Sequence, residues 1–169
     1  MPLFFKVSQL FPVCSIALAL TFAGCGGEPK PAGMPPLHPA TLVFTQEGEP
    51  IAGASVQLVS ETDSRWPIGG STDTAGTIAL KTYGKYPGVP EGKYKVVVSK
   101  VEREQIGPAP QSMYEVQKEN VFDLIDANYS IPEKTPLTIE VKPGKNSYEP
   151  FDLGKKIRQK VKKPGDIKE

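Results

Sequence analysis

Residues 93–99 show the strictest alternation of hydrophobic and polar positions in the chain. Tyr94, Val96 and Val98 occupy every second position, and the intervening residues are polar apart from Val97. The segment follows a Pro/Gly turn at residues 89–92. Period-two alternation behind such a turn is typical of a β-strand with one buried face. The pattern predicts a central strand of an antiparallel sandwich.

Six further segments read as strands, because they place alternating or β-branched residues between turn signals. They lie at residues 40–45, 55–60, 66–72, 77–82, 137–142 and 147–153. Asp73 and Gly76 mark a hairpin turn, since Asp can cap its own turn and Gly accepts positive φ. Pro150 places the last strand at an edge. The expected fold is all-β, a seven-stranded antiparallel sandwich.

Residues 101–136 form an insertion between the fifth and sixth expected strands. Residues 105–111 read as a Gly/Pro loop, and residues 112–125 fit helical spacing only in part. We expect a short helix or irregular segment over one end of the sandwich, with Tyr129 and Ile131 returning the chain to the core.

The N-terminal 24 residues have the pattern of an export signal. Lys6 precedes an apolar run over residues 10–24, which ends in small residues suited to cleavage. The run is shorter than the roughly 20 residues that a membrane span needs. Export is therefore expected, with a retained transmembrane anchor as the alternative.

Residues 22–25 read Phe-Ala-Gly-Cys and resemble the lipobox of bacterial lipoproteins, although Phe22 stands where leucine is usual. The resemblance implies that Cys25 is lipidated and becomes the new N-terminus, and two acyl chains suffice for stable anchoring. The alternative is an ordinary signal peptide with a coincidental cysteine. The Pro/Gly-rich residues 26–39 would then be a spacer that holds a domain off the membrane. Cys14 would leave with the signal, so no intramolecular disulfide is expected.

Length and composition suit this organisation. The chain has 169 residues, with 18 prolines and 16 glycines, which fits one domain of short strands and many turns plus flexible ends. Residues 154–169 are strongly basic, and the body before them is mildly acidic. We expect this tail to be disordered, with contact to anionic lipid or cell-wall polymer as the functional alternative. The phosphate groups of a nucleic acid would attract such a basic tail. Export would separate the protein from DNA, so no nucleic-acid partner is expected.

Three phrases carry a resemblance to a known family. They are Gly-Glu-Pro-Ile-Ala-Gly-Ala-Ser-Val at residues 48–56, Thr-Asp-Thr-Ala-Gly at 72–76 and Pro-Glu-Gly-Lys-Tyr-Lys-Val at 90–96. With the expected strands they resemble the carboxypeptidase regulatory-like, or transthyretin-like, β-sandwich over residues 40–153. With the lipobox and residues 137–144, the chain is similar to small predicted lipoproteins of planctomycetes. The resemblance implies an Ig-like, prealbumin-like sandwich and says little about function, since many unrelated proteins carry it.

Catalytic residues are scarce. A hydrolytic triad needs a base beside a nucleophile, whereas His38 lies in the spacer and Cys25 is the expected lipidation site. Zinc sites prefer the same two residue types. The transthyretin-like hydroxyisourate hydrolases depend on histidines within the domain, and this domain has none. Asp123, Asp126 and Asn128 match no EF-hand spacing and favour a solvated acidic loop over a calcium site. We therefore expect no enzyme, no cofactor and no metal.

Binding residues are easier to nominate. Four aromatic residues fall in expected loops or strand ends, where their rings could stack on sugars or enter a partner. They are Trp66, Tyr83, Tyr86 and Tyr114. The alternative is that Trp66 covers the core and the tyrosines cover strand edges.

The expected protein is a non-enzymatic, lipid-anchored component of a bacterial cell envelope, facing a periplasm or the cell surface. Its sandwich would serve as a structural or interaction module. Its partners would be membrane lipid through Cys25 and an envelope protein or polysaccharide. A carbohydrate-binding module that uses the four aromatic residues is the alternative function, and an enzyme accessory domain is a third.

Overall fold

The computed structural model describes residues 29–62, 65–108, 112 and 117–161 of the chain. All of its secondary structure lies in the compact unit Ala32–Glu169. Within the described residues this unit is all-β, apart from the 3-10 helix η1 (Ala127–Ser130). The expected fold class is confirmed at this level, although the strands are shorter and more numerous than the seven predicted.

The first sheet is antiparallel and has six strands in the order β13-β10-β4-β5-β7-β8. These are β13 (Thr138–Val141), β10 (Gly92–Ser99), β4 (Ser55–Ser60), β5 (Ile68–Ser71), β7 (Lys81–Thr82) and β8 (Tyr86–Pro87). Strand β10 lies inside the sheet, because it pairs with β4 on one side and β13 on the other. The strongest strand pattern in the sequence thus forms a central strand, as predicted.

The second sheet is built around β2 (Ala40–Gln46). The strands β3 (Glu49–Pro50) and β6 (Thr77–Ala79) pair with it in antiparallel register. The strands β14 (Asn146–Ser147) and β15 (Phe151–Asp152) pair with it in parallel, which corrects the expectation of a wholly antiparallel fold. The chain reaches β14 by crossing over from β13 in the other sheet, so no hairpin with β2 fixes its direction.

One hydrophobic core holds the two sheets together. Strand β2 contributes Ala40, Leu42 and Phe44, and β10 contributes Tyr94, Val96 and Val98, in both cases from alternate positions. The rest of the buried cluster is Ile51, Ala54, Val56, Leu58, Ile68, Ile78, Leu80, Val89, Ile125, Ile139, Val141 and Leu153. Inward faces of two sheets that share one core are the arrangement of a β-sandwich.

The expected strand over residues 77–82 serves both sheets. Its first half, β6, pairs with β2, and its second half, β7, pairs with β5. The change of sheet occurs at the buried Leu80, whose backbone N–H donates to the carbonyl of Ala40 (3.0 Å). Buried residues alternate with exposed ones through both halves, because Ile78, Leu80 and Thr82 all face the core. The sequence therefore predicted one continuous strand.

The expected spacer is partly ordered. Its last residues form β1 (Leu37–His38), which pairs with β9 (Val89–Pro90) in a separate two-stranded sheet. The folded part of the chain therefore begins before residue 40. The preceding signal and Cys25 lie outside the described residues.

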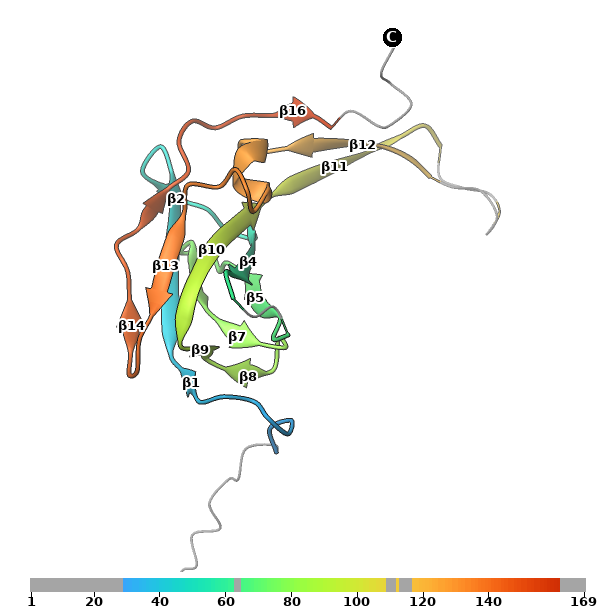
Figure 1. Cartoon of the computed structure of the whole chain (residues 1–169). Helices are drawn as coiled ribbons and strands as arrows, with labels where there is room; N and C mark the ends of the chain where they lie inside the picture. Colours follow the sequence, from blue (N-terminus) through green and yellow to red (C-terminus); the bar gives the residue numbers. More distant parts are fainter. Residues whose placement is uncertain (1–28, 63–64, 109–111, 113–116, 162–169) are drawn as a thin grey trace, which may run out of the picture. The chain divides into compact units, whose positions relative to one another are not determined.

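The expected helical insertion is instead a hairpin of β11 (Val101–Ile106) and β12 (Lys118–Asp123), which corrects the prediction. Only Lys100 separates β10 from β11, so the chain stays extended beyond the sandwich (Figure 1). A third strand, β16 (Gln159–Lys160), pairs with β12. We call β11, β12 and β16 the arm. The tail expected to be disordered is thus ordered as far as Val161, and its remaining residues lie outside the described part.

Candidate functional site

Two of the four predicted aromatic residues come together. The rings of Trp66 and Tyr83 meet edge to face, with centroids 5.8 Å apart and an interplanar angle of 84°. The Tyr83 hydroxyl donates to the carbonyl of Arg65 (3.3 Å), which fixes the ring beside the Trp66 loop. Tyr86 lies in β8, and the Lys85 ammonium is 5.5 Å from its ring centroid. Tyr114 lies outside the described residues.

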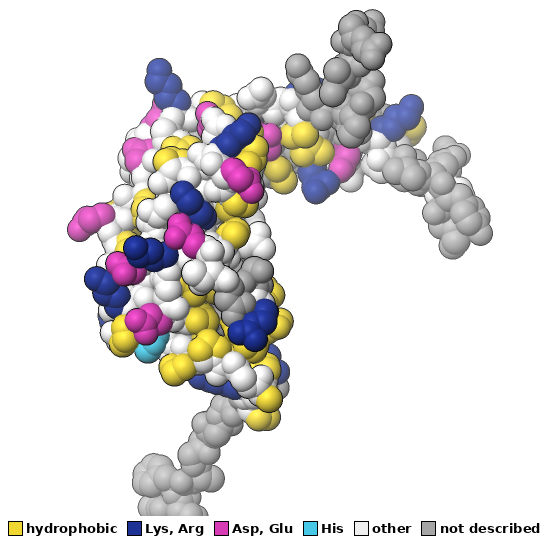
Figure 2. Space-filling model, viewed as in Figure 1, with side chains coloured by type: hydrophobic (Ala, Val, Ile, Leu, Met, Phe, Trp, Pro, Cys, Tyr) yellow, Lys and Arg dark blue, Asp and Glu magenta, His cyan; other side chains and the backbone are white. Residues whose placement is uncertain are grey.

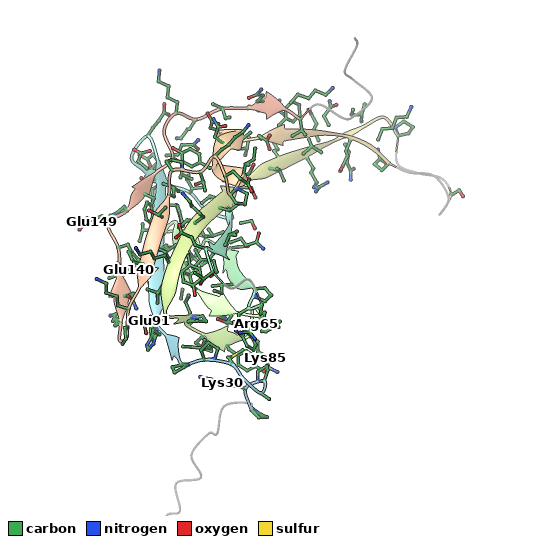
Figure 3. The ribbon with its side chains drawn as sticks, in the orientation of Figure 1. Lys30, Arg65, Lys85, Glu91, Glu140 and Glu149 are labelled. Carbon is green, nitrogen blue, oxygen red and sulfur yellow. The ribbon has the colours of Figure 1, made fainter. Side chains whose placement is uncertain are left out.

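Trp66 opens onto a hollow of about 310 Å³, which we call the Trp66 hollow. Its size is at the lower end of the roughly 300–1,000 Å³ that small-molecule sites occupy. The polar and aromatic lining comprises His38, Ser60, Thr62, Arg65, Glu91 and Tyr94 beside Trp66 itself. Figure 3 shows Arg65 and Glu91 at the end of the sandwich that carries β8 and β9. A hollow that combines an indole with hydroxyl and charged groups suits a polar ligand with one apolar face.

Trp66 lies beside the core residues Ile68 and Tyr94, which line the same hollow. It is half-buried, and the partly buried hydrophobic side chains that pack against the core are Tyr129, Leu137, Tyr148 and Phe151. Its ring contacts the ring of Tyr83, and the Arg65 guanidinium carbon lies 6.0 Å from its centroid. Whether Trp66 serves as a cover of the core or as a binding residue stays a prediction, whereas the return of Tyr129 to the core is confirmed.

Two other polar residues of the hollow have structural partners. His38 Nδ1 accepts a hydrogen bond from the backbone N–H of Gly144 (3.2 Å), and the Tyr94 hydroxyl donates to the carbonyl of Pro90 (2.9 Å). Both bonds shape the wall of the hollow. The sequence analysis did not propose Arg65 or Glu91 as binding residues. Arg65 could have been proposed, because it directly precedes Trp66 in the sequence.

The carboxylates of Asp126 and Asp73 accept hydrogen bonds from backbone N–H groups. Asp126 Oδ1 accepts from the N–H of Asn128 (2.9 Å) and caps η1. Asp73 Oδ1 accepts from the N–H groups of Ala75 and Thr77 (both 2.9 Å), which confirms its predicted role in the turn. Over the described ranges, no group of three or more His, Cys, Asp or Glu residues is placed to hold a metal ion.

Comparison with protein-family models and with curated proteins returns no match to this chain. Among the helices of the described part, none is long and apolar enough to cross a membrane. The arrangement around Trp66 offers an aromatic surface beside hydrogen-bonding groups.

Proposed function

We propose that the chain is an exported, lipid-anchored protein of a bacterial cell envelope whose sandwich is a non-enzymatic interaction module. The sandwich would be of the carboxypeptidase regulatory-like, transthyretin-like type. The observation that carries the proposal is the Phe-Ala-Gly-Cys motif at residues 22–25, which closes an apolar run and precedes a Pro/Gly-rich spacer. The all-β domain, whose first strand β1 is formed by the last residues of this spacer, supports it.

The mechanism is passive. Acyl chains on Cys25 hold the protein at the membrane, since two chains suffice for stable anchoring. Residues 26–31 give the domain reach, because a Pro-rich segment is semi-rigid and extended. The following residues belong to the folded body, since Gly33, Pro35 and Pro36 line the Trp66 hollow. The domain then presents its loops and its arm to a partner in the envelope.

Replacement of Cys25 tests the anchor. The full-length chain is expressed in a Gram-negative host, and its cells are separated into membrane and soluble fractions. Cys25→Ala is expected to move the protein from the membrane fraction to the soluble one, because the acylated residue is lost. Cys14→Ala is the matched control, since it removes the other cysteine, and the protein should stay in the membrane fraction. Retention of Cys25→Ala in carbonate-washed membranes would contradict the proposal.

Carbohydrate binding is the second candidate function, and the Trp66 hollow favours it. The sugar ring has an apolar C–H face and an edge of hydroxyl groups. The half-buried indole of Trp66 can stack on the apolar face. The hydroxyl groups can form hydrogen bonds with polar side chains of the hollow, which are Ser60, Thr62, Arg65 and Glu91. The polysaccharides of the cell envelope are the nearest source of such a ligand for a protein anchored there.

A further inference from the structure

A second hollow lies on the outer face of the first sheet. It has a volume of about 570 Å³, and we call it the sheet groove. Its polar lining is Ser55 and Gln57 from β4 and Ser71 from β5, and Tyr83 stands at its border. Gln57 and Gly69 are direct cross-strand partners, so their side-chain positions share this outer face.

The sheet groove and the Trp66 hollow are neighbours. Ile68 lines both of them, and the edge-to-face pair of Trp66 and Tyr83 stands between them. Trp66 belongs to the hollow and Tyr83 to the groove. A ligand that rests on one ring therefore reaches the other without leaving the surface of the protein.

Tyr83 is held in an unusual conformation. Its φ is 56°, in the left-handed region that bulky residues rarely adopt. Its backbone N–H donates to the carbonyl of Pro67 (2.7 Å), and 49% of its surface is exposed. The hairpin turn between β7 and β8 accounts for the conformation, because Tyr83 and Gly84 (φ 66°) are its two central residues and the N–H of Lys85 donates to the carbonyl of Thr82 (3.2 Å). The turn thus presents the Tyr83 ring at the surface.

The floor of the groove selects against a peptide strand. Strand β5 pairs with β4 along its whole length and with β7 at Ile68 and Gly69, so β5 offers no free edge for strand addition at these two residues. At Gly69 a Cβ would collide with the carbonyl oxygen of Val56, which keeps that part of the floor free of side chains. A ligand here must be recognised by hydroxyl and amide side chains and by one aromatic ring, which suits a polyhydroxylated chain.

We infer that the Trp66 hollow and the sheet groove form one continuous binding path for a linear polysaccharide, with Tyr83 as the stacking ring at its centre. The inference rests on the carbohydrate candidate above and extends it to a second site and to a chain-shaped ligand. Since the path includes two hollows, affinity should rise with the length of the sugar chain.

The test is calorimetric titration of the full-length protein in detergent with oligomers of β-1,4-linked glucose and of β-1,4-linked N-acetylglucosamine. Each series is used at two and at six sugar units. In at least one series the six-unit oligomer should bind at least tenfold more tightly than the two-unit oligomer. It should also change the fluorescence of Trp66, the only tryptophan in the chain.

Two variants separate the groove from the hollow. Ser71→Tyr fills the groove from an exposed strand position that accepts an aromatic residue, and Tyr83→Asn removes the ring but suits the left-handed conformation. Each should reduce six-unit binding at least tenfold. Ser71→Tyr should also leave two-unit binding unchanged, because Ser71 lines the groove and not the hollow. Tyr86→Ala is the matched control, because Tyr86 lines neither hollow, and it should bind like the unchanged protein.

The outcomes are distinguishable. Equal affinity for two and six units, or an unaltered six-unit affinity in both Ser71→Tyr and Tyr83→Asn, would overturn the continuous path and leave the Trp66 hollow as a separate site. Absence of binding in both series would overturn the carbohydrate candidate together with the path.

Discussion

At the scale of single residues, the sandwich depends on which face of a strand a side chain occupies. On β10, Val96 is fully buried and Val97, its neighbour in sequence, is only half-buried on the opposite face. The backbone of Val96 is also used, since the buried Thr135 hydroxyl donates to its carbonyl (2.8 Å). No disulfide is expected to support this core, so packing carries its stability.

A charge on each face of β10 tests this. Val96→Asp should destabilise the domain by roughly 3–5 kcal/mol, because it leaves an uncompensated charge in the core. Val97→Asp makes the same chemical change one residue later and should cost about 1 kcal/mol or less. Urea denaturation followed by circular dichroism measures both. Similar losses in the two variants would show that the two faces do not differ as described.

The candidate binding residues illustrate what the sequence could predict at this scale. Trp66 and Tyr83 were recognisable because large aromatic residues in expected loops are candidates for contact. Their pairing was not, since it depends on the fold bringing the end of β7 beside the loop before β5. Tyr86 is also an aromatic residue in an expected loop and lines neither hollow, so residue type alone did not identify the tyrosine that lies beside Trp66.

At the scale of elements, the arm differs from the sandwich in how it is held. Every residue of β11 is exposed, so the arm lacks the one-sided burial that stabilises the other strands. Figure 2 shows hydrophobic and charged side chains side by side along it. Arg158 connects its strands: Nε donates to Glu102 (2.9 Å), Nη2 donates to Glu104 (3.4 Å), and Cζ lies 3.7 Å from the ring centroid of Phe122. The hydrogen bond to Glu102 is the main cause that raises the pKa of Arg158.

The same exposure explains why the sequence predicted the sandwich strands and missed the arm. Segments such as residues 55–60 alternate because one face is buried, and the structure has β4 at those residues. In β11 neither face is buried, so hydrophobic and polar residues do not alternate along it. Its central residues Glu102, Arg103 and Glu104 are all charged. The basic tail likewise gave no sign of β16, since Arg158 is ordered by carboxylates more than 50 positions away in sequence.

Removal of Arg158 should therefore loosen the arm selectively. In Arg158→Ala, amide hydrogen exchange of β11, β12 and β16 should accelerate a few-fold, and exchange of β10 and β4 should not change. The increase is limited because exposed ion pairs contribute little to stability and are screened by salt. Arg158→Lys should lie between, since lysine keeps the charge and loses the fork and the ring contact.

Lys155→Ala is the control for this prediction, because it removes an exposed positive charge from the same segment. Exchange-coupled mass spectrometry at low and high salt measures all three variants. Equal exchange of the arm in Arg158→Ala and Lys155→Ala would show that Arg158 has no special role in holding it.

At the scale of the whole molecule, the last residues of the spacer are part of the folded body. Strand β1 pairs with β9 through Leu37–Pro90 and His38–Val89, and Val89 is fully buried. Gly88 has a φ of 103°, and a Cβ there would press against the backbone of His38 at 3.0–3.2 Å. The close approach of β1 thus requires glycine at this position. The sequence pattern indicated a spacer here because the segment is rich in proline. A strand of only two residues is too short to show an alternating pattern.

A chain that begins at Ala40 should therefore be less stable than one that begins at Ala32. It loses the pairing of β1 with β9 and the hydrogen bond between His38 and Gly144. The melting temperature should fall by several degrees, since about 1 kcal/mol shifts the midpoint of a domain of this size by roughly 2–8 °C. Differential scanning calorimetry compares the two chains, and a chain that begins at Pro36 is the control, because it retains β1 and should melt close to the longer one. If all three melted together, the domain would begin at residue 40, as the hydrophobic pattern alone predicts, and β1 would add nothing to its stability.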